Sequence, residues 1–537
     1  MNNIDYIIVG AGSAGCVLAH RLSEDPSVNV VLLEAGGKDS KLEIHVPAGY
    51  IKLHNSKVDW AYETVPQTDM DGRVMAQPRG KVLGGCSSTN AMAYIRGNKL
   101  DYEEWAELGN PGWDFESVLP YFTRSEDNAQ FDDRYHGKNG PLYVGHTSFR
   151  SPYAEAFREA AIKSGVEAND DFNGEQQEGV GYFQYTIKNG KRWSTAAAFL
   201  KPIMSRPNLK VITKAQTTRI LLENKRAIGV EYQQNGQRKT LHCSGEVLLS
   251  AGAFGSPQLL MLSGIGPAAH LQEHGISVTA DLPGVGQNLQ DHLIMGMASR
   301  AQVGPSLNRA ETLGNYFKYF VNKSGPLTSG PLEACAFVKL RRTDRPDIQF
   351  HFAPAHGTDM HDYDSMPKKE DGFSILPTLL RPHSVGELRL NSKDPMAYPL
   401  INPRYFSEEE DLLTMLEGME MAVDLVHSDS FRHLGVEMYF PSKHRTRADL
   451  KRHIMDHIQT CYHPVGTCKM GTDEMAVVDP ELRVRGVEGL RVIDAAVMPT
   501  VISGNTNAPA IMIGEKGADL VRGHVLRSRE KEKSGQV

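Results

Sequence analysis

A histidine beside a proline is the first group in this sequence that could carry acid–base chemistry. His463 lies in the segment Tyr462-His463-Pro464-Val465-Gly466-Thr467. Imidazole titrates near neutral pH, so this side chain can take a proton from a reacting hydroxyl group. Pro464 favours an extended backbone at His463. The chain has 20 histidines, and a structural role for His463 is the alternative interpretation.

An asparagine in a later polar segment could assist such a base. Asn507 lies in Ser503-Gly504-Asn505-Thr506-Asn507-Ala508-Pro509. Its amide can donate a hydrogen bond to a substrate oxygen while His463 accepts the proton. A simple turn residue is the alternative, because asparagine near glycine is common in turns. A helix expected from about residue 509 to 521 would begin beside Asn507 and direct its positive end into the site.

A glycine-rich run near the N-terminus has the pattern of a dinucleotide-binding turn. The apolar residues Tyr6-Ile7-Ile8-Val9 precede it, as expected of a buried parallel strand. Gly10 permits the tight turn, Gly12 lets the backbone approach a pyrophosphate, and Gly15 lets the following helix pack closely. Free N–H groups at the start of that helix attract phosphate. The run is Gly10-Ala11-Gly12-Ser13-Ala14-Gly15.

An acid follows the second expected strand and completes this pattern. Glu34 comes directly after Asn29-Val30-Val31-Leu32-Leu33. Its carboxylate can accept hydrogen bonds from the ribose hydroxyls of an adenosine, and it disfavours the 2′-phosphate of NADP. The motif therefore indicates a dinucleotide site and leaves FAD and NAD as alternatives.

A second glycine-rich segment runs from Pro78 to Asn90. It combines the pair Gly84-Gly85 with small hydroxyl residues, and the apolar residues Ala91-Met92-Ala93 follow it. Small side chains let a backbone lie flat against a large planar ligand. Taken alone, the segment is equally compatible with a flexible surface loop.

Together these blocks resemble the glucose-methanol-choline family of FAD-dependent oxidoreductases. Its first signature resembles residues 80–90, and its second resembles residues 252–266, Gly252-Ala253-Phe254-Gly255-Ser256-Pro257-Gln258 onward. The likeness extends from about Tyr6 to Leu520. Further family-like blocks are Glu34-Ala35-Gly36, His136-Gly137, Gly140-Pro141-Leu142, His463-Pro464-Val465-Gly466-Thr467, Met470-Gly471, Asp494-Ala495-Ala496-Val497-Met498-Pro499 and Gly504-Asn505-Thr506-Asn507-Ala508-Pro509.

The resemblance implies non-covalent FAD and a set of site residues. Some members attach FAD through a histidine just before the asparagine of the first signature, and this sequence has Thr89 there. By resemblance His463 is the catalytic histidine and Asn507 its partner. The implied cofactor contacts are Gly10, Gly12, Ser13, Ala14, Gly15, Glu34, Ala35, Trp60, Gly84, Asn90, Ala91, Met92, Ala93, Thr217, Ala251, Asp494, Ala495, Asn505 and Thr506.

The implied reaction is oxidation of a primary alcohol to the aldehyde. Hydride passes to flavin N5 and His463 acts as general base. The electrons go on to a quinone or another carrier, or to O₂; the sequence blocks favour a dehydrogenase. Glu333 and His351 are candidates for substrate contacts, with a solvated or ion-paired acid and an ordinary strand histidine as alternatives. A hydroxynitrile lyase-like protein that keeps FAD without redox chemistry, an NAD-dependent dehydrogenase and a non-catalytic flavoprotein are the other functions considered.

The elements that must position these residues form an α/β protein. The chain has 537 residues, of which 40% are hydrophobic, enough for a large core. We expect a Rossmann-like, three-layer FAD-binding domain with a parallel sheet, formed by residues 1–150, 205–294 and 456–525. An interleaved α+β substrate domain with a mixed or antiparallel sheet is expected from residues 151–204 and 295–455. Residues 526–537 are expected to be a frayed tail.

Several elements can be placed from their patterns. Residues 209–212, 218–221 and 228–232 alternate as hairpin strands do. Residues 247–250 read as a strand, followed by a glycine turn and a helix that Pro257 begins and that ends at Leu262. Strands are expected at 348–352 and 386–390, and an amphipathic helix at 408–426.

Composition narrows the compartment and the partners. The net charge is −7, which disfavours general nucleic-acid binding. Apolar runs are far shorter than the roughly 20 residues of a membrane-spanning helix, although loose contact with a membrane surface stays open. Six dispersed cysteines and an N-terminus without a signal pattern favour the cytoplasm. Cys461, His463 and Cys468 lack the usual zinc spacing, so no metal is expected.

Overall fold

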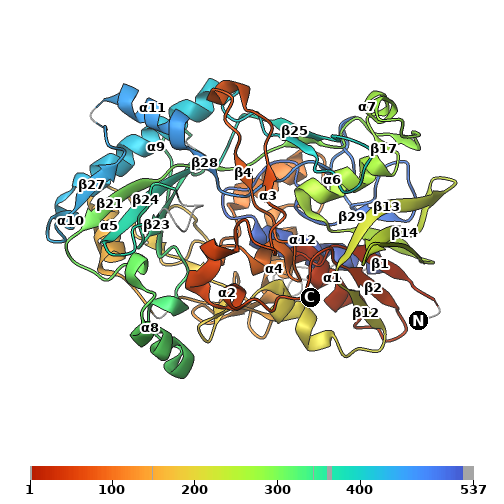
Figure 1. Ribbon diagram of the computed structural model, residues 1–537, viewed down its shortest axis with the longest axis horizontal. Helices are drawn as coiled ribbons and strands as arrows, with labels where there is room; N and C mark the ends of the chain where they lie inside the picture. Colours follow the sequence, from red (N-terminus) through yellow and green to blue (C-terminus); the bar gives the residue numbers. More distant parts are fainter. Residues whose placement is uncertain (1–2, 148, 343, 360–365, 445, 524–537) are drawn as a thin grey trace, which may run out of the picture.

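The computed structural model describes residues 3–147, 149–342, 344–359, 366–444 and 446–523. The C-terminal segment 526–537, which was expected to be frayed, lies outside the described residues. Two regions lie side by side in Figure 1, each built on its own sheet. The N-terminal strands belong to the region on the right, and the strands of the middle of the chain belong to the region on the left.

The first region contains a five-stranded parallel sheet in the order β12-β2-β1-β16-β29. The strands are short, and all except the edge strand β12 are almost fully buried, as expected of a sheet covered on both faces. The strands are β1 (Tyr6–Val9), β2 (Val30–Leu33), β12 (Leu209–Ile212), β16 (Glu246–Leu249) and β29 (Leu490–Val492).

Helices and an antiparallel sheet form the layers beside this parallel sheet. The helices α1 (Ser13–Leu22) and α12 (Asn507–Arg522) pack against each other, although they come from opposite ends of the chain. The antiparallel strands β13 (Ala215–Glu223), β14 (Arg226–Gln234) and β15 (Gln237–His242) form a further layer, in which β14 contacts β16. The expected α/β, Rossmann-like architecture is confirmed.

Two local expectations in this region were wrong. Residues 209–212 do not belong to a hairpin: they form β12, which pairs in parallel with β2. An alternating pattern indicates a strand but does not reveal its partner, and the true hairpin is β13–β14, with β15 as its third strand.

The helix of the second signature begins earlier than expected. It is α6 (Gly252–Leu262), so Pro257 lies inside the helix and does not begin it. A proline within a helix cannot donate to the carbonyl four residues before it, which here belongs to Ala253. The hydroxyl of Thr467 donates to that carbonyl at 2.6 Å. This contact supplies the hydrogen bond that Pro257 removes.

The second region contains an eight-stranded antiparallel sheet. Its main path is β27-β21-β24-β23-β22-β8, and β20 and β28 attach to it through β24. The strands are β8 (Gly179–Tyr182), β20 (Leu293–Ile294), β21 (Met297–Ala301), β22 (Ala334–Val338), β23 (Ile348–Ala353), β24 (Asp371–Leu379), β27 (Glu437–Phe440) and β28 (Gln459–Thr460). The helices of this region are α5 (Pro152–Lys163), α9 (Glu409–His427), α10 (Asp429–Arg432) and α11 (Arg447–His457).

The amphipathic helix and the first strand expected here are close to their observed bounds, α9 and β23. The second expected strand, β25 (Gly386–Arg389), lies elsewhere. It pairs with β19 (Gln287–Leu289) and β26 (Leu400–Asn402), and it packs against α6. Leu388 of this strand belongs to the apolar core of the parallel sheet. The division of the chain into the two domains stays a prediction.

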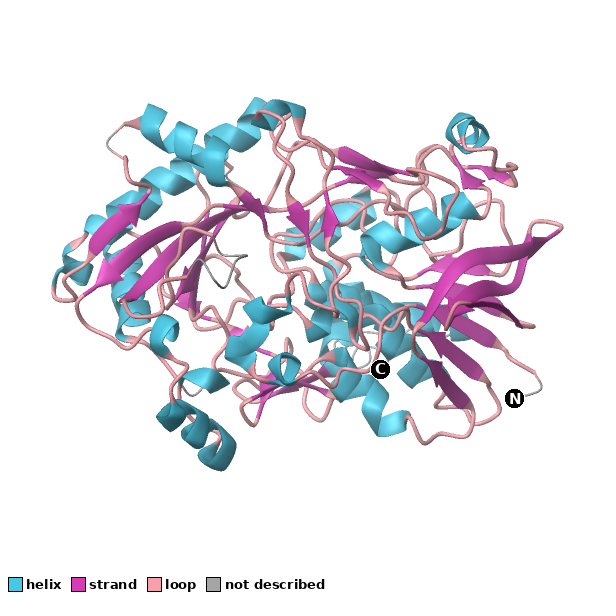
Figure 2. Cartoon of the chain, in the orientation of Figure 1, coloured by secondary structure: helices cyan, strands magenta, loops and turns pink. Residues whose placement is uncertain are grey.

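The remaining elements are short. The other helices are α2 (Leu42–His45), α3 (Lys99–Glu107), α4 (Phe115–Ser125), α7 (Ala268–Glu273), α8 (Leu313–Phe317), the π-helices η4 (Ala196–Leu200) and η7 (Lys318–Asn322), and the 3₁₀ helices η1 (Pro47–Leu53), η2 (Thr68–Met70), η3 (Gly85–Ser88), η5 (Lys201–Ile203), η6 (Leu307–Arg309), η8 (Pro326–Thr328) and η10 (Ala495–Val497). The short strands are β3 (Tyr62–Glu63), β4 (Ala76–Gln77), β5 (Ala93–Tyr94), β6 (Glu126–Asn128), β7 (Leu142–Val144), β9 (Gln184–Tyr185), β10 (Ile187–Lys188), β11 (Lys191–Arg192), β17 (Ile265–Gly266) and β18 (Ala280–Asp281). Within the described part of the chain, none of the helices has the length and apolarity needed to cross a membrane. In Figure 2, α8 and η7 stand out from the edge of the second region.

Candidate active site

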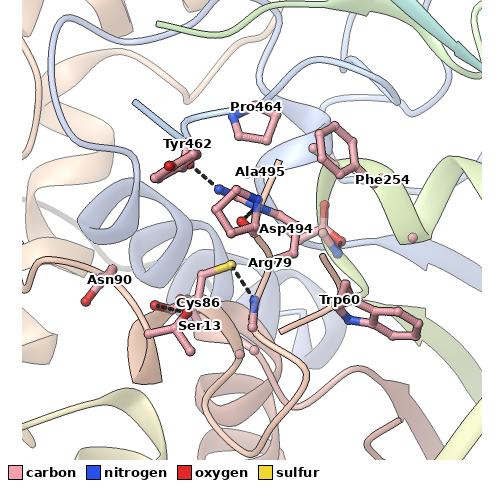
Figure 3. Close-up of a pocket in the computed structure, with 18 of the residues that line it drawn as sticks. Ser13, Trp60, Arg79, Cys86, Asn90, Phe254, Tyr462, Pro464, Asp494 and Ala495 are labelled. Carbon is pink, nitrogen blue, oxygen red and sulfur yellow. Dashed lines mark hydrogen bonds between the residues drawn. The ribbon is translucent and has the colours of Figure 1, made fainter. Parts of the chain in front are cut away.

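One cavity brings together most of the residues that the sequence singles out. It reaches from the start of α1 to the segment around His463, and its space, counted with its opening to solvent, is about 2270 Å³. Figure 3 shows a part of its wall. The sequence-predicted residues that line it are Gly10, Gly12, Ser13, Ala14, Glu34, Ala35, Trp60, Asn90, Ala91, Met92, Ala93, Thr217, Ala251, His351, His463, Asp494, Ala495, Asn505, Thr506 and Asn507.

Gly15, Gly84 and Glu333 do not line the cavity. The two glycines act behind it. A Cβ atom at Gly15 would lie 1.9 Å from the carbonyl oxygen of Gly10, so only glycine lets α1 pack on the turn. Gly84 donates its N–H to the carbonyl of Ala11 at 2.7 Å, and it holds the second glycine-rich segment against the first.

The turn before α1 presents backbone N–H groups to the cavity. Gly10 has a φ of +98°, and a Cβ atom there would lie 2.4 Å from the carbonyl oxygen of Ser250. Gly12 is the N-cap of α1, and no side chain caps the helix within the described residues. The first N–H groups of α1 therefore stay available for an anionic ligand, as phosphate binding requires.

The carboxyl group of Glu34 is fixed by the backbone at the end of β2. It accepts hydrogen bonds from Ala11 N at 2.9 Å and from Gly36 N at 2.7 Å. Burial raises the pKa of Glu34 to about 7, against the hydrogen bonds that lower it. Each carboxyl oxygen keeps a lone pair beyond these bonds, so the group can still accept from ribose hydroxyls.

A second acid organises the start of α6. Asp494 accepts from Gly252 N at 2.8 Å and from the Ser256 hydroxyl at 2.6 Å, and it also accepts from Ala496 N at 2.8 Å. The helix α6 is thereby tied to the turn at residues 494–496, and both line the cavity.

Three polar atoms in the cavity wall test whether the site fits a large polar cofactor. Thr217 Oγ1, His351 Nε2 and Asn505 Oδ1 are buried, and none has a hydrogen-bond partner among the residues that the structure describes. Buried polar groups are normally satisfied. Together with the open N–H groups of α1 and the fixed carboxyl of Glu34, these atoms suit a dinucleotide with a polar ring system.

Two hydrogen bonds fix the position of His463. Its backbone N–H donates to Asp291 Oδ1 at 2.8 Å, and its Nδ1 lies 2.9 Å from Nδ1 of His292. The other ring nitrogen of His292, Nε2, lies 3.0 Å from the carbonyl oxygen of Leu380. Asn505 Nδ2 lies 3.3 Å from His463 Nε2.

These contacts determine where the protons of the two rings sit. A carbonyl oxygen only accepts, so His292 Nε2 carries the proton that it donates to Leu380. In neutral His292 the Nδ1 atom then accepts, and His463 Nδ1–H is the donor to it. His463 Nε2 is left unprotonated, which agrees with the amide donor of Asn505 beside it. The ring thus presents a basic nitrogen to the cavity.

The surroundings keep both rings neutral. Burial lowers the pKa of His463 well below 6.5, and electrostatic coupling to His292 and His351, together with the charge of Arg79, lowers it further. Burial also lowers the pKa of His292 to about 3. Arg79 holds its place by donating to the backbone carbonyl of Tyr462 at 2.6 Å, as the dashed line in Figure 3 shows.

Asn507 lines the same cavity as His463, as expected, and its role in catalysis stays a prediction. Its Oδ1 accepts from the hydroxyl of Ser13 at 2.7 Å, and it is the first residue of α12, which packs on α1. The amide beside His463 belongs instead to Asn505, which was expected only as a cofactor contact. Asn505 and Asn507 are only two residues apart, but their side chains point in different directions because α12 begins between them. The sequence does not show which of the two amides faces His463.

Asp291, His292 and Arg79 were missed by sequence reasoning. Asp291 and His292 are adjacent polar residues between the buried Leu289 and Leu293, a signal that could have drawn attention to them. Asp291 also accepts from Tyr405 and from Thr460, at 2.6 and 2.5 Å, so its carboxyl is fully engaged in holding the segment of His463.

Glu333 does not reach the cavity. Its carboxyl accepts from the backbone N–H and the hydroxyl of Ser151, at 2.9 and 2.6 Å, at the start of α5. Burial raises its pKa to about 7. The neighbouring residue Leu332 is the one that lines the cavity, because successive side chains of an extended segment point to opposite sides.

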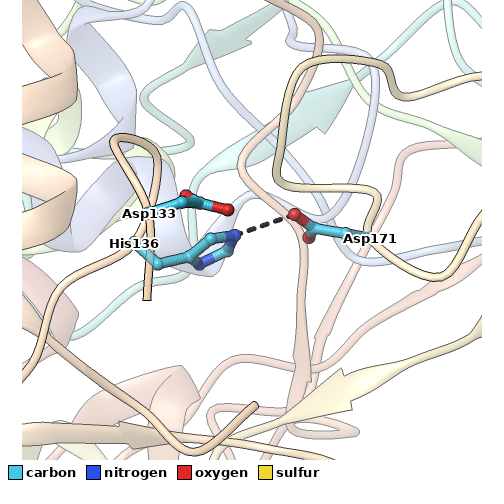
Figure 4. A group of neighbouring side chains, drawn as sticks. All are labelled: Asp133, His136 and Asp171. Atoms are coloured by element: carbon cyan, nitrogen blue, oxygen red, sulfur yellow. Dashed lines mark hydrogen bonds and ion pairs between the residues drawn. The ribbon is translucent and has the colours of Figure 1, made fainter. Parts of the chain in front are cut away.

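Another ionisable group lies apart from the cavity wall. His136 Nε2 is 2.8 Å from Asp171 Oδ2, with Asp133 nearby (Figure 4), and His136 Nδ1 is 3.3 Å from Glu126 Oε2. Within the described part of the chain, Asp133, His136 and Asp171 are the set whose possible metal-ligand atoms come together. The Nε2 atom is engaged by Asp171, and the group reads as an ion-paired histidine. Cys461, His463 and Cys468 form no such set among the described residues.

Known proteins are similar to this chain over nearly its whole length. Two family models, both described as GMC oxidoreductase, match residues 4–294 and residues 382–514. The alcohol dehydrogenase [acceptor] of Pseudomonas putida is 44% identical, over 96% of this chain and 95% of that protein. The mitochondrial choline dehydrogenase of Mus musculus is 41% identical, over 97% of this chain and 89% of that protein.

Solved structures agree with the sequence relatives. A structure of formate oxidase from Aspergillus oryzae RIB40, titled for its FAD modification, has a TM-score of 0.90 and 30% sequence identity. The match covers 97% of this chain and 98% of that chain. The similarity of fold therefore includes both sheet regions.

Proposed function

This chain belongs to the GMC oxidoreductase family, and from that premise we propose that it oxidises a primary alcohol to the aldehyde with His463 as general base. The family places the chain among FAD-dependent oxidoreductases that act on CH–OH groups. The observation that carries the finer proposal is the neutral ring of His463, whose Nε2 nitrogen stands in the cavity wall without a proton.

The reaction removes a hydride from the alcohol carbon and a proton from its oxygen. When bound, FAD supplies at N5 the two-electron acceptor for the hydride. His463 Nε2 takes the hydroxyl proton, so charge does not build up on the oxygen as the hydride leaves. The backbone N–H to Asp291 and the Nδ1–H to His292 keep the ring in one orientation during this transfer.

Asn505 is the proposed partner of the base. Its Nδ2 atom is 3.3 Å from His463 Nε2. An alcohol oxygen bound beside both atoms would replace this contact, donating its proton to the imidazole and accepting from the amide. An amide donor stabilises the partial negative charge that develops on the oxygen. We assign Asn507, whose side chain faces Ser13, to the cofactor side of the cavity.

The cofactor contacts divide along the cavity. The N–H groups at the start of α1 would hold the pyrophosphate, the carboxyl of Glu34 the ribose, and Thr217 the adenine end. Attachment is proposed to be non-covalent, because Thr89 offers no nitrogen nucleophile and its hydroxyl faces the carbonyl of Cys86 at 3.5 Å. Acid precipitation of the protein should release the flavin into the supernatant; a yellow pellet would contradict this.

The cavity favours an uncharged alcohol. Among the described residues, the carboxylates that line it are Glu34, Asp59 and Asp494, and each accepts hydrogen bonds from backbone N–H groups. Glu333 turns away from it. A quaternary ammonium substrate would therefore find no free carboxylate. The electrons are proposed to pass to a quinone or another carrier, because the sequence relatives named above are dehydrogenases.

Anaerobic mixing with a panel of alcohols tests the proposal. Primary aliphatic alcohols should bleach the flavin band in single-turnover experiments, and choline should do so more slowly. Faster bleaching by choline would contradict the substrate class. A flavin that stays oxidised with every alcohol would support the alternative of a non-redox FAD protein. Reoxidation by a quinone should exceed reoxidation by O₂; the reverse order would make the protein an oxidase.

A further inference from the structure

An exposed apolar face runs along the helix formed by α8 and η7. Leu313, Phe317, Phe320 and Val321 are 90%, 64%, 52% and 61% exposed. Their spacing of four, three and one residues places them on one side of a helix. Figure 1 shows α8 standing out from the lower edge of the second region. Single exposed apolar residues are ordinary, but a contiguous set on one helix marks an interaction surface.

The opposite side of the same helix is firmly packed. Tyr319 is 2% exposed and lies in a small core with Val46, Ala310 and Leu327. The hydroxyl of Thr312 caps the helix by accepting from Asn315 N at 3.2 Å. The helix therefore has a defined orientation, and its apolar face is presented outward by the fold.

Two basic residues belong to the same segment as the apolar face. Lys318 and Lys323 lie on the helix and at its end, and Lys323 Nζ is 5.7 Å from the ring centre of Phe320. The acid of this segment, Glu311, is ion-paired with Lys52. The whole chain has a net charge of −7, so a segment that combines an apolar face with two lysines differs in charge from the protein as a whole.

We propose that the face of Leu313, Phe317, Phe320 and Val321 docks on an anionic lipid bilayer. A short helix with phenylalanine and leucine on one side and lysines beside them has the composition of an interfacial helix. Lysines near the surface add attraction to anionic headgroups. A second copy of this chain fits the face less well, because a two-fold interface on it would bring the lysines of both copies into one interface with no acid of this segment free to pair with them.

The position of this face gives docking a consequence for the cavity. The helix packs on Val46, at the start of η1, and η1 supplies Tyr50 and Leu53 to the cavity wall. Docking would therefore hold this wall of the cavity near the lipid, where apolar alcohols and quinones concentrate. This consequence rests on the proposed function, whereas the docking does not.

Vesicle co-sedimentation of the FAD-loaded protein tests the docking. The probes are vesicles of phosphatidylglycerol and phosphatidylethanolamine, with vesicles of phosphatidylcholine as the uncharged comparison. We expect binding to the anionic vesicles, weakened by high salt. The double variant Phe317→Ser/Phe320→Ser should lower the partition coefficient at least about tenfold, because it removes two large apolar side chains from the interface. Lys318→Glu/Lys323→Glu should also lower it roughly tenfold or more.

Matched controls make the result decisive. Leu108→Ser/Val278→Ser removes two exposed apolar residues from other helices and loops, and it should bind vesicles like the wild type. All variants should keep their flavin and their rate of reduction by alcohol, so a failure of the proposed reaction stays distinguishable from a failure of docking. Equal binding of wild type and Phe317→Ser/Phe320→Ser would overturn the proposal. A stable dimer that this variant converts to monomer would overturn it in favour of self-association.

Discussion

His136 and His463 are both buried histidines held by hydrogen bonds, yet their surroundings shift their pKa values in opposite directions. Burial alone would lower the pKa of His136, but its hydrogen bonds to Asp171 and Glu126 outweigh burial and raise the pKa above 6.5. Burial of His463, together with the charge of Arg79 and electrostatic coupling to His292 and His351, lowers its pKa well below 6.5. Carboxylates beside the ring of His136 favour its protonated form, whereas the groups that contact the ring of His463 in the described residues favour the neutral form.

The backbone reinforces this difference. Asp291 lies beside His463 but binds its backbone N–H, so the carboxylate positions the residue without charging the ring. Around His136, Arg96 binds Glu126 in turn and completes a closed ion-paired network between β6 and the segment at Asp171. One region uses charge to join segments of chain, and the other avoids charge to keep a nitrogen basic.

Replacing the base should have the largest effect. His463→Ala should keep its FAD but lose roughly 10²–10⁴-fold in the rate of flavin reduction by alcohol, the usual contribution of a general base. Anaerobic stopped-flow measurement at the flavin band gives this rate. Reduction at the wild-type rate would place the base elsewhere.

Replacing His136 should have the opposite effects, a loss of stability with no change in flavin reduction. His136→Gln should lower the free energy of unfolding by about 1.5–3 kcal/mol, the range for hydrogen bonds to charged groups, and should leave flavin reduction unchanged. Because the folded-state pKa is raised, this stabilisation is fully present below about pH 6.5 and is lost as pH rises through the folded pKa.

Thermal unfolding of wild type and His136→Gln over a pH series measures this difference. The gap between the two melting temperatures should narrow toward high pH. A gap that widens toward high pH would show that His136 is neutral when folded. The proposed difference in pKa shift between His136 and His463 would then be contradicted.

Removing the partner of the base should have a smaller effect. His292 does not line the cavity, so His292→Leu should keep FAD and slow reduction roughly 10–100-fold, as loss of an orienting partner does elsewhere. His292→Asn should recover part of the rate, because its amide oxygen can accept from His463 Nδ1–H. The loss should appear in the limiting rate and not in alcohol affinity; equal rates in the two variants would contradict a tautomer role.

Much of the fold could be predicted from local pattern. The apolar run Tyr6–Val9, the glycine turn and Glu34 define their own strand, helix and strand, because each depends on neighbours in sequence. The partner of β12 and the start of α6 could not be predicted in this way. The first depends on which strand lies beside it, and the second on a hydrogen bond from Thr467, more than 200 residues away in the chain.

The residues of the site also divide into those that local sequence identifies and those that depend on distant contacts. The family-like blocks led to His463 and to most of the cavity wall, since these residues lie in recognisable segments. His292 and Arg79 contact the segment of His463 across the fold. The polar pair at residues 291–292 and the glycine-rich segment around Arg79 mark them in the sequence, but neither pattern shows that they meet His463. The motif around Asn505 and Asn507 shows a limit of local pattern, because the turn before α12 decides how each amide is oriented.

The pH dependence of anaerobic flavin reduction tests the central claim, that His463 acts as a neutral base, most directly. Protonated His463 cannot accept the hydroxyl proton, so the rate should be level at neutral and alkaline pH and fall only toward acid. The account predicts an apparent pKa below 6.5 for this decline, and its absence from the residual rate of His463→Ala. A decline that begins above pH 6.5, with an apparent pKa raised like that of His136, would contradict it.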